Sequence, residues 1–266
     1  MPAVDTAPIF LAKDKGYFSD ENLELDIILF TNAQDRQSAL QSGEIDGAMT
    51  DLVAVAVNIA GGFQLKATTL TDGMFPILTH PGSTEKAAVK IGLMEISVSN
   101  FLADHWLSAD YELEKVFINS IPARLEAVAA GQLDMGLFPE PIASVGVLRG
   151  MEKLIYPPVA GFCPDVMAFT GDALKKQAAL TAFHKAYNRA VADIKADENE
   201  ARDSLMKNIP NLKPELRDLI ELPVYHEARL PDEAFLSDII EWTDSITDQK
   251  IELSPDMLIG GGFVNK

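Results

Sequence analysis

Short, largely apolar runs alternate with amphipathic stretches along most of the chain. Such runs are typical of buried strands, whereas apolar residues three and four positions apart are typical of helices. Strands are expected at residues 23–30, 45–49, 65–70, 76–80, 90–94, 153–156 and 166–170. A helix is expected within residues 7–18, where it would stop at Gly16. Further helices are expected at residues 32–42, 52–59, 97–108 and 235–246, and others after residue 172. Strands that alternate with helices at this spacing predict an α/β fold with mainly parallel sheets.

One segment of the chain occurs twice. Residues 25–51 and 113–139 align without a gap, and the alignment places Arg36 on Arg124 and Gly43 on Gly131. Each copy has the pattern of a strand, a loop, a helix, a glycine stop and a second strand. Two copies in one chain predict two similar lobes with a cleft between them.

Two breaks divide the chain into three blocks. They lie at residues 71–73 and 157–164, where Gly and Pro interrupt the pattern. The middle block, residues 74–164, contains a complete repeat, so we expect it to form lobe 2. Residues 1–73 and 165–266 would together form lobe 1. A chain that leaves a lobe and returns to it crosses the hinge twice, which permits closure around a ligand.

Composition narrows the classes of function. The 266 residues include 22 basic and 40 acidic ones, for a formal net charge of −18. Nucleic-acid binding needs Lys and Arg to neutralise phosphates, so no nucleic-acid partner is expected. The longest apolar stretch, residues 52–60, is far shorter than the roughly 20 residues that a membrane span needs. The first ten residues have no signal-peptide pattern, so the protein is expected to be cytoplasmic or to have lost a leader.

The sequence carries no signature of catalysis or of metal binding. Its four histidines, His80, His105, His184 and His226, lack metal-ligand spacing. No GxSxG motif occurs, and the single cysteine, Cys163, has no evident histidine partner and forms no internal disulfide. We therefore expect no catalytic residues, no metal and no cofactor.

Three stretches carry a resemblance to a known family: LAKDKGYF (11–18), SGEIDGAMTD (42–51) and AAGQLDMGLFPEP (129–141). They resemble the solute-binding proteins of ABC importers, in the group that binds thiamine pyrimidine precursors, alkanesulfonates, taurine and nitrate. The resemblance implies a type II periplasmic-binding fold, with two α/β lobes, a ligand cleft and a double-crossover hinge. It also implies an ABC permease as partner and a periplasmic or membrane-anchored extracellular location, and we expect a monomer.

The chain departs from this family in two ways. Relatives usually begin with a strand just before the stretch that matches residues 2–8, and here only residues 1–4 stand in its place. That strand normally lies in the centre of the sheet, so the resemblance implies that lobe 1 lacks it or has it cut short. The leader that relatives carry is also absent, so export is implied by the family alone.

Ligand contacts are expected where strands end and helices begin. In such sheets, ligands bind outside the carboxyl ends of the strands, where helix N-termini present free N–H groups. Residues at these positions and at the hinge are the candidates: Asp5, Thr6, Asn32, Thr50, Asp51, Ser97, Ser99, Asn119, Phe138, Glu140 and Phe162. For Thr50 and Asp51, a helix cap worth about 1 kcal/mol is an equally good interpretation. Arg36 and Arg124 are interpreted as structural.

The selected loops contain carboxylates but no Lys or Arg. We therefore favour a small nitrogenous solute, such as a thiamine pyrimidine precursor, on which Phe138 or Phe162 could stack. An alkanesulfonate, taurine or nitrate held by helix N-termini is an alternative. Another is an enzyme resembling the pyrimidine synthases or the menaquinone-precursor synthases; the pyrimidine synthases carry a cysteine cluster where this chain has only Cys163. A third is the ligand-sensing domain of a regulator, which would normally follow a helix-turn-helix.

Overall fold

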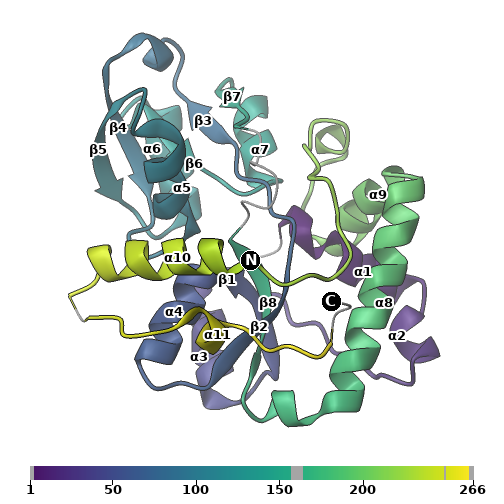
Figure 1. Cartoon of the computed structure of the whole chain (residues 1–266). Helices are drawn as coiled ribbons and strands as arrows, with labels where there is room; N and C mark the ends of the chain where they lie inside the picture. The colour runs from purple at the N-terminus through teal and green to yellow at the C-terminus, as the bar shows by residue number, and fades with distance from the viewer. Residues whose placement is uncertain (1–2, 157–163, 249, 264–266) are drawn as a thin grey trace.

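The computed structural model describes residues 3–156, 164–248 and 250–263. The chain forms two lobes, each built on one sheet with helices packed on it (Figure 1). Predicted ligand residue Phe162 lies outside the described residues, as does Cys163. No helix in the described part of the chain is long and apolar enough to cross a membrane.

The sheet of lobe 1 has three strands in the order β1-β8-β2. They are β1 (Gly47–Asp51), β8 (Asp165–Thr170) and β2 (Leu65–Leu70). The sheet of lobe 2 has five strands in the order β5-β4-β6-β3-β7. They are β5 (Glu112–Phe117), β4 (Ala88–Leu93), β6 (Met135–Leu137), β3 (Ile77–Thr79) and β7 (Glu152–Leu154).

Neither sheet is mainly parallel, contrary to the prediction. Strand β4 pairs in parallel with β5 and β6, but β3 runs antiparallel to both its neighbours. In lobe 1, β8 runs antiparallel to both β1 and β2. Both reversed strands directly follow a crossing between the lobes. They enter their sheet from the cleft side and therefore run opposite to the strands that end there.

The predicted strand at residues 23–30 is the other difference. The segment is extended, and Leu23, Leu25 and Ile27 are half-buried while Glu24 and Asp26 are exposed. That alternation is typical of a strand with one face on a core. The segment nevertheless joins no sheet, because none of the described strands lies beside it as a pairing partner.

The helices follow the predicted pattern, and their ends agree with the sequence signals. Gly16 and Gly43 adopt left-handed φ angles of 76° and 77° where α1 and α3 end, as glycine allows. The α-helices are α1 (Ala7–Asp14), α2 (Tyr17–Asp20), α3 (Ala33–Ser42), α4 (Leu52–Ala60), α5 (Val98–Leu107), α6 (Ile121–Ala129), α7 (Ile142–Leu148), α8 (Gln177–Ala196), α9 (Asn199–Asn208), α10 (Glu233–Ile246) and α11 (Pro255–Leu258). Short 3₁₀ helices lie at Val4–Thr6, Ser83–Glu85, Ala173–Lys175 and Pro214–Leu216.

Helix α10 joins the two lobes on one side (Figure 1). It packs on α4 of lobe 1 and also reaches α5 of lobe 2. The ring centroids of Phe101 and Trp242 lie 5.3 Å apart, and the Trp242 indole N–H donates to Asp104 over 2.9 Å. The apolar core therefore continues from one lobe into the other through α10.

Candidate functional site

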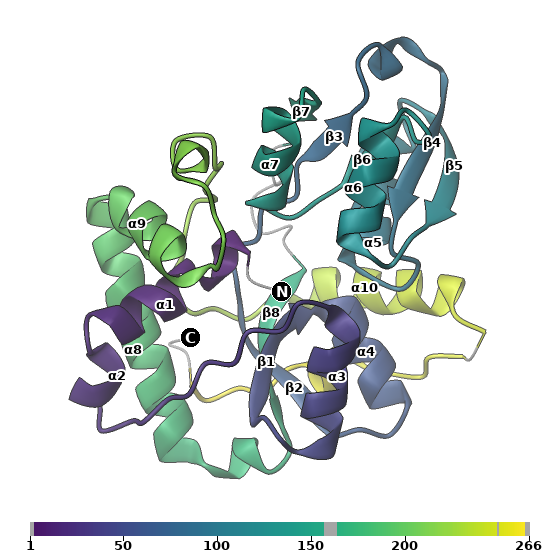
Figure 2. The same ribbon diagram turned by 180° about the vertical axis from the view of Figure 1, so that it is seen from behind.

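A cavity of about 690 Å³ lies between the lobes. Seen from behind, α3 and α4 of lobe 1 stand on one side of the gap, and α5 and α6 of lobe 2 stand on the other (Figure 2). Eight of the eleven predicted ligand residues line the cavity: Asp5, Thr6, Asn32, Thr50, Asp51, Ser97, Ser99 and Asn119. The structure thus brings together, from both lobes, most of the residues that the strand-end rule selects.

Four helices present their N-termini to this cavity. Asn32 caps α3 by accepting from Asp35 N–H over 2.8 Å, and Asp51 caps α4 by accepting from Ala54 N–H over 2.9 Å. Ser97 caps α5, and Ser120 caps α6. The first turns of these helices carry partial positive charge and N–H groups that a solute can use.

The hydroxyls of Ser97 and Ser99 are already engaged. Their oxygens lie 2.8 Å apart, Ser97 also donates to Met94 O over 3.0 Å, and Ser99 accepts from Met94 N–H over 3.0 Å. The pair thus fixes the turn between β4 and α5. Asn119, by contrast, is exposed where β5 leads into α6.

Three carboxyl groups gather on the lobe 1 side of the cavity: Asp5, Asp51 and Asp165. Burial raises the pKa of Asp5 to about 6, against a lowering contribution from its hydrogen bond with Thr71 (3.0 Å). Burial, and then the charges of Asp5 and Asp51, raise the pKa of Asp165 well above its ordinary value. Burial also raises the pKa of Asp51, although Arg36 and several backbone N–H groups act in the opposite direction. Too little positive charge surrounds these carboxyl groups to offset the cost of ionising them in a buried site.

The two arginines of the repeat both line the cavity. Arg36 donates to Thr50 Oγ1 over 3.2 Å. Arg124 is 1% exposed and donates to the backbone oxygens of Ile118 (2.8 Å) and Leu137 (3.3 Å). Burial lowers its pKa to about 10, and no carboxylate within the described ranges forms an ion pair with it. Arg124 is thus a buried cation held by neutral groups.

The ring of Phe138 packs against the guanidinium of Arg124 inside lobe 2. The ring is fully buried in the core of lobe 2, and the guanidinium carbon lies 5.2 Å from its centroid. Gly92 on β4 leaves room for the arginine stem, because a Cβ there would come within 2.8 Å of Arg124 Cγ. The structure therefore places Phe138 beneath the arginine and away from the cavity lining, contrary to the stacking expected from the sequence.

Glu140 is also placed away from the cavity lining. Its carboxylate is fully buried and accepts from Lys153 Nζ (2.9 Å), Ser144 Oγ (3.0 Å) and Ser144 N–H (3.1 Å). Lys153 also donates to the carbonyl of Leu219 over 2.9 Å, and Ser144 Oγ lies 2.7 Å from the same oxygen. The predicted ligand residue Glu140 thus forms a buried ion pair that fastens lobe 2 to the chain around residues 219–221.

Sequence reasoning overlooked Asp165, and it did not place either arginine in the cavity. Asp165 is the first residue of β8, where the chain re-enters lobe 1. The rule that selects strand ends and helix starts did not select it, because a strand begins there and no helix does. The matching positions of Arg36 and Arg124 in the repeat were a usable signal, since both helices start at the cleft. No three His, Cys, Asp or Glu side chains in the described part of the chain form a group that could hold a metal ion.

Comparisons with known proteins agree with this architecture. A family model described as NMT1/THI5 like matches residues 3–71. No curated protein matches the chain.

Solved structures of similar fold cover nearly the whole chain. The ligand-binding component of an ABC-type import system from Staphylococcus aureus, with zinc bound, has a TM-score of 0.79 at 17% identity, covering 97% of this chain and 94% of that one. The periplasmic aliphatic sulphonate-binding protein SsuA from Escherichia coli has a TM-score of 0.72 at 16% identity, with 96% and 89% covered. The periplasmic nitrate-binding protein NrtA from Synechocystis PCC 6803 has a TM-score of 0.67 at 14% identity, with 96% and 84% covered. Together with the two lobes and the cavity between them, these similarities show that the chain has the fold of the periplasmic binding proteins.

Proposed function

We propose that the protein is the solute-binding component of an ABC importer. The observation that carries this proposal is the cavity of about 690 Å³ whose lining comes from both lobes. A solute in that position contacts both lobes at once, so it favours a closed arrangement over an open one. The crossing between the lobes at residues 71–76 is where such a closure would bend.

The proposed solute is small and bears an amino or other cationic nitrogen group. Asp5, Asp51 and Asp165 would pair with that group, and its charge would relieve their mutual repulsion. Neutralising a carboxylate that pairs with a buried cation should cost roughly 3–5 kcal/mol of binding. An aminopyrimidine, such as a thiamine pyrimidine precursor, has this chemistry.

Arg124 favours a second candidate, a solute with an acidic group. Its guanidinium has only neutral partners among the described residues, and it lines the cavity together with the first residues of α5 and α6. A sulfonate, phosphate or nitrate at this position would have one charge-assisted partner and free backbone N–H groups. A solute with an amino group at one end and an acidic group at the other would satisfy both sides of the cavity.

A thermal-shift screen followed by calorimetry tests this function and separates the solutes. The panel holds an aminopyrimidine, its phosphate ester, taurine, an alkanesulfonate without an amino group, and nitrate. A specific solute at 100 times its dissociation constant should add about 2.7 kcal/mol of stability. Binding of nitrate or the plain alkanesulfonate, with no binding of amino-bearing solutes, would reject the carboxylate side of the proposal. Conversion of one of these solutes into a product would instead favour an enzyme.

The proposed partner is an ABC permease, with the protein acting as a monomer outside the cytoplasmic membrane. The lobe faces around the cavity are the surfaces that move relative to each other when the cavity closes, so a permease could distinguish the loaded form. A compact shift in small-angle X-ray scattering on addition of the solute would support closure. An unchanged profile at saturation would contradict it.

A further inference from the structure

The interlobe cavity has one aromatic side chain among its described lining residues, that of Phe75. Phe75 lies on the crossing between the lobes, shortly after Gly73, and it is half-buried against the apolar core. Phe138, which the sequence indicated as a stacking residue, is instead buried beneath Arg124. Within the described part of the chain, the ring of Phe75 is therefore the aromatic surface that a solute in this cavity can contact.

The ring of Phe75 and the carboxyl group of Asp165 meet at Gly73. A Cβ atom on Gly73 would lie 2.1 Å from Asp165 Oδ2 and 2.9 Å from Phe75 Cε2. Both groups thus lie against the backbone of a residue without a side chain, at the point where the chain passes from lobe 1 to lobe 2. The backbone oxygen of Asp165 also accepts from Thr71 N–H over 2.8 Å. The ring and the carboxyl group therefore lie close together where the two lobes join.

The carboxyl group of Asp165 has no hydrogen-bond partner within the described ranges, although the residue is only 6% exposed. The other two carboxyl groups of the cavity differ in this respect. Asp5 accepts from Thr71 Oγ1 over 3.0 Å, and Asp51 accepts from Ala54 N–H over 2.9 Å. A buried carboxyl group without a partner costs free energy, and a ligand that supplies N–H donors removes that cost.

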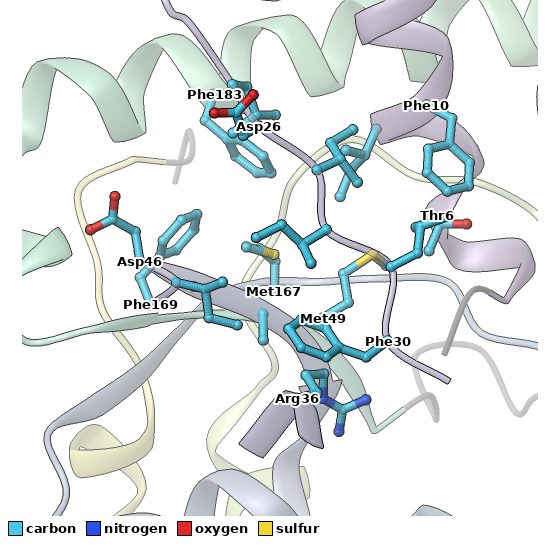
Figure 3. Close-up of a pocket in the computed structure, with 18 of the residues that line it drawn as sticks. Thr6, Phe10, Asp26, Phe30, Arg36, Asp46, Met49, Met167, Phe169 and Phe183 are labelled. Atoms are coloured by element: carbon cyan, nitrogen blue, oxygen red, sulfur yellow. The ribbon is translucent and has the colours of Figure 1, made fainter. Parts of the chain in front are cut away.

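Arg36 lines the same cavity but does not pair with Asp165. Its guanidinium donates to Thr50 Oγ1 over 3.2 Å. Figure 3 shows this guanidinium at the margin of a second pocket, inside lobe 1, where it points away from the apolar side chains of Phe10 and Phe183. The oxygens of Asp165 thus stay available to a cation that enters the interlobe cavity.

We propose that Phe75 and Asp165 together select a solute with an aromatic nitrogen ring, an inference that rests on the proposed solute-binding function. Asp165 accepts from a ring N–H and a neighbouring exocyclic amino group, which form two parallel donors like those of a guanidinium. Phe75 stacks on the face of the same ring, and positive charge on that ring strengthens the contact. Because both side chains lie at Gly73, one rigid ring contacts both, whereas an aliphatic cation contacts Asp165 alone.

Two probes separate these contacts in calorimetry on the full chain. 4-Aminopyrimidine has both the ring and the donor pair, whereas acetamidine has the donor pair without the ring. Phe75→Leu, which keeps an apolar side chain, should weaken 4-aminopyrimidine about tenfold or more and leave acetamidine within about twofold. Asp165→Asn should weaken both probes about tenfold or more. Phe75→Tyr is the matched control, because it keeps the aromatic face and should keep most of the affinity for 4-aminopyrimidine.

A measurement on the unmodified protein keeps the test independent of how the variants fold. With the phenylalanine rings isotopically labelled, NMR should show Overhauser contacts between the ring protons of bound 4-aminopyrimidine and those of Phe75. Loss of the signal in Phe75→Tyr assigns it to this residue.

Each outcome decides the proposal. A loss confined to 4-aminopyrimidine in Phe75→Leu, together with a loss of both probes in Asp165→Asn, supports it. Equal effects on the two probes in Phe75→Leu would mean that Phe75 only forms part of the cavity wall, and would overturn it. A missing Overhauser contact would also overturn it.

Failure of this inference is distinguishable from failure of the proposed function. If the unmodified protein binds neither probe but binds taurine or nitrate and closes, the inference is wrong and the solute-binding function stands. If 4-aminopyrimidine binds through Phe75 but no solute closes the lobes, the inference stands and the proposed function is wrong.

Discussion

Lys153 Nζ lies 2.9 Å from Oε1 of Glu140, and the Glu140 side chain is fully buried. The pair does more than neutralise charge, because Lys153 also donates to the Leu219 carbonyl and so fastens two segments 66 residues apart. Removing one member would leave the other charged and buried.

Glu140→Gln should therefore lower the free energy of unfolding by about 3–5 kcal/mol, the usual cost of breaking a buried ion pair. Chemical denaturation measures this loss. Glu221→Gln is the matched control, since Glu221 lies 3.7 Å from the same ammonium group but its side chain is 46% exposed. It should cost less than about 1 kcal/mol. A folded Glu140→Gln protein with full stability and weakened solute binding would instead place Glu140 in the site.

Arg124 gives a prediction about the solute. Arg124→Met should weaken binding of solutes with an acidic group while leaving amino-only solutes largely unaffected, because it removes a buried cation from the cavity lining. A loss of about 2–3 kcal/mol, or roughly 30- to 150-fold in affinity by calorimetry, is expected for a charge-assisted hydrogen bond. Gly92→Ala is a second check, since its Cβ would come within 2.6 Å of Leu133 Cδ1 and 2.8 Å of Arg124 Cγ and would force these side chains to shift. Unchanged affinity for every acidic solute in both variants would remove Arg124 from binding.

Asp51 has a capping role that can be separated from its charge. Asp51→Asn should keep the cap on α4, so stability should change by less than about 0.5 kcal/mol, whereas Asp51→Ala should cost about 1 kcal/mol. Both variants should weaken an amino-bearing solute, measured by calorimetry. Asp232→Asn, at the cap of α10, serves as control because Asp232 does not line the cavity. Equal solute affinity in all of these proteins would show that Asp51 acts as a cap alone.

Asp5 makes stability depend on pH. Its pKa in the folded protein is about 6, above the ordinary 3.8, because burial disfavours the charged form. The folded state therefore holds this proton more tightly than the unfolded state does. The resulting stability is fully present below pH 3.8 and is lost as the pH rises through about 6. The loss amounts to about 3 kcal/mol if Asp5 titrates alone.

Asp5→Asn should flatten the stability profile between pH 4 and 7, as measured by urea unfolding. The titration of Asp165 is linked to that of Asp5, so the slope that remains should come from Asp165. A cationic solute should release protons on binding near pH 6, which calorimetry in buffers of different ionisation enthalpy detects. A profile in Asp5→Asn as steep as that of the unmodified protein would contradict the assignment.

The sequence by itself determined the repeat, the alternation of helices and strands and the positions of most helix ends. These features are local: apolar spacing sets each element, and left-handed glycines such as Gly16 and Gly43 end helices. The rule that ligands lie at strand ends also selected eight residues that line the interlobe cavity. Local signals in the sequence therefore predicted the α/β character of each lobe and many residues of the candidate site.

The tertiary structure decided what depends on partners far along the chain. Residues 23–30 have the pattern of a strand, but a strand needs a hydrogen-bonding neighbour, and none of the described strands pairs with them. Glu140 forms a buried ion pair because the fold places Lys153 beside it. Arg124, by contrast, lines the cavity without a carboxylate partner among the described residues. Charge pairing and strand pairing are both set by contacts that spacing along the sequence does not encode.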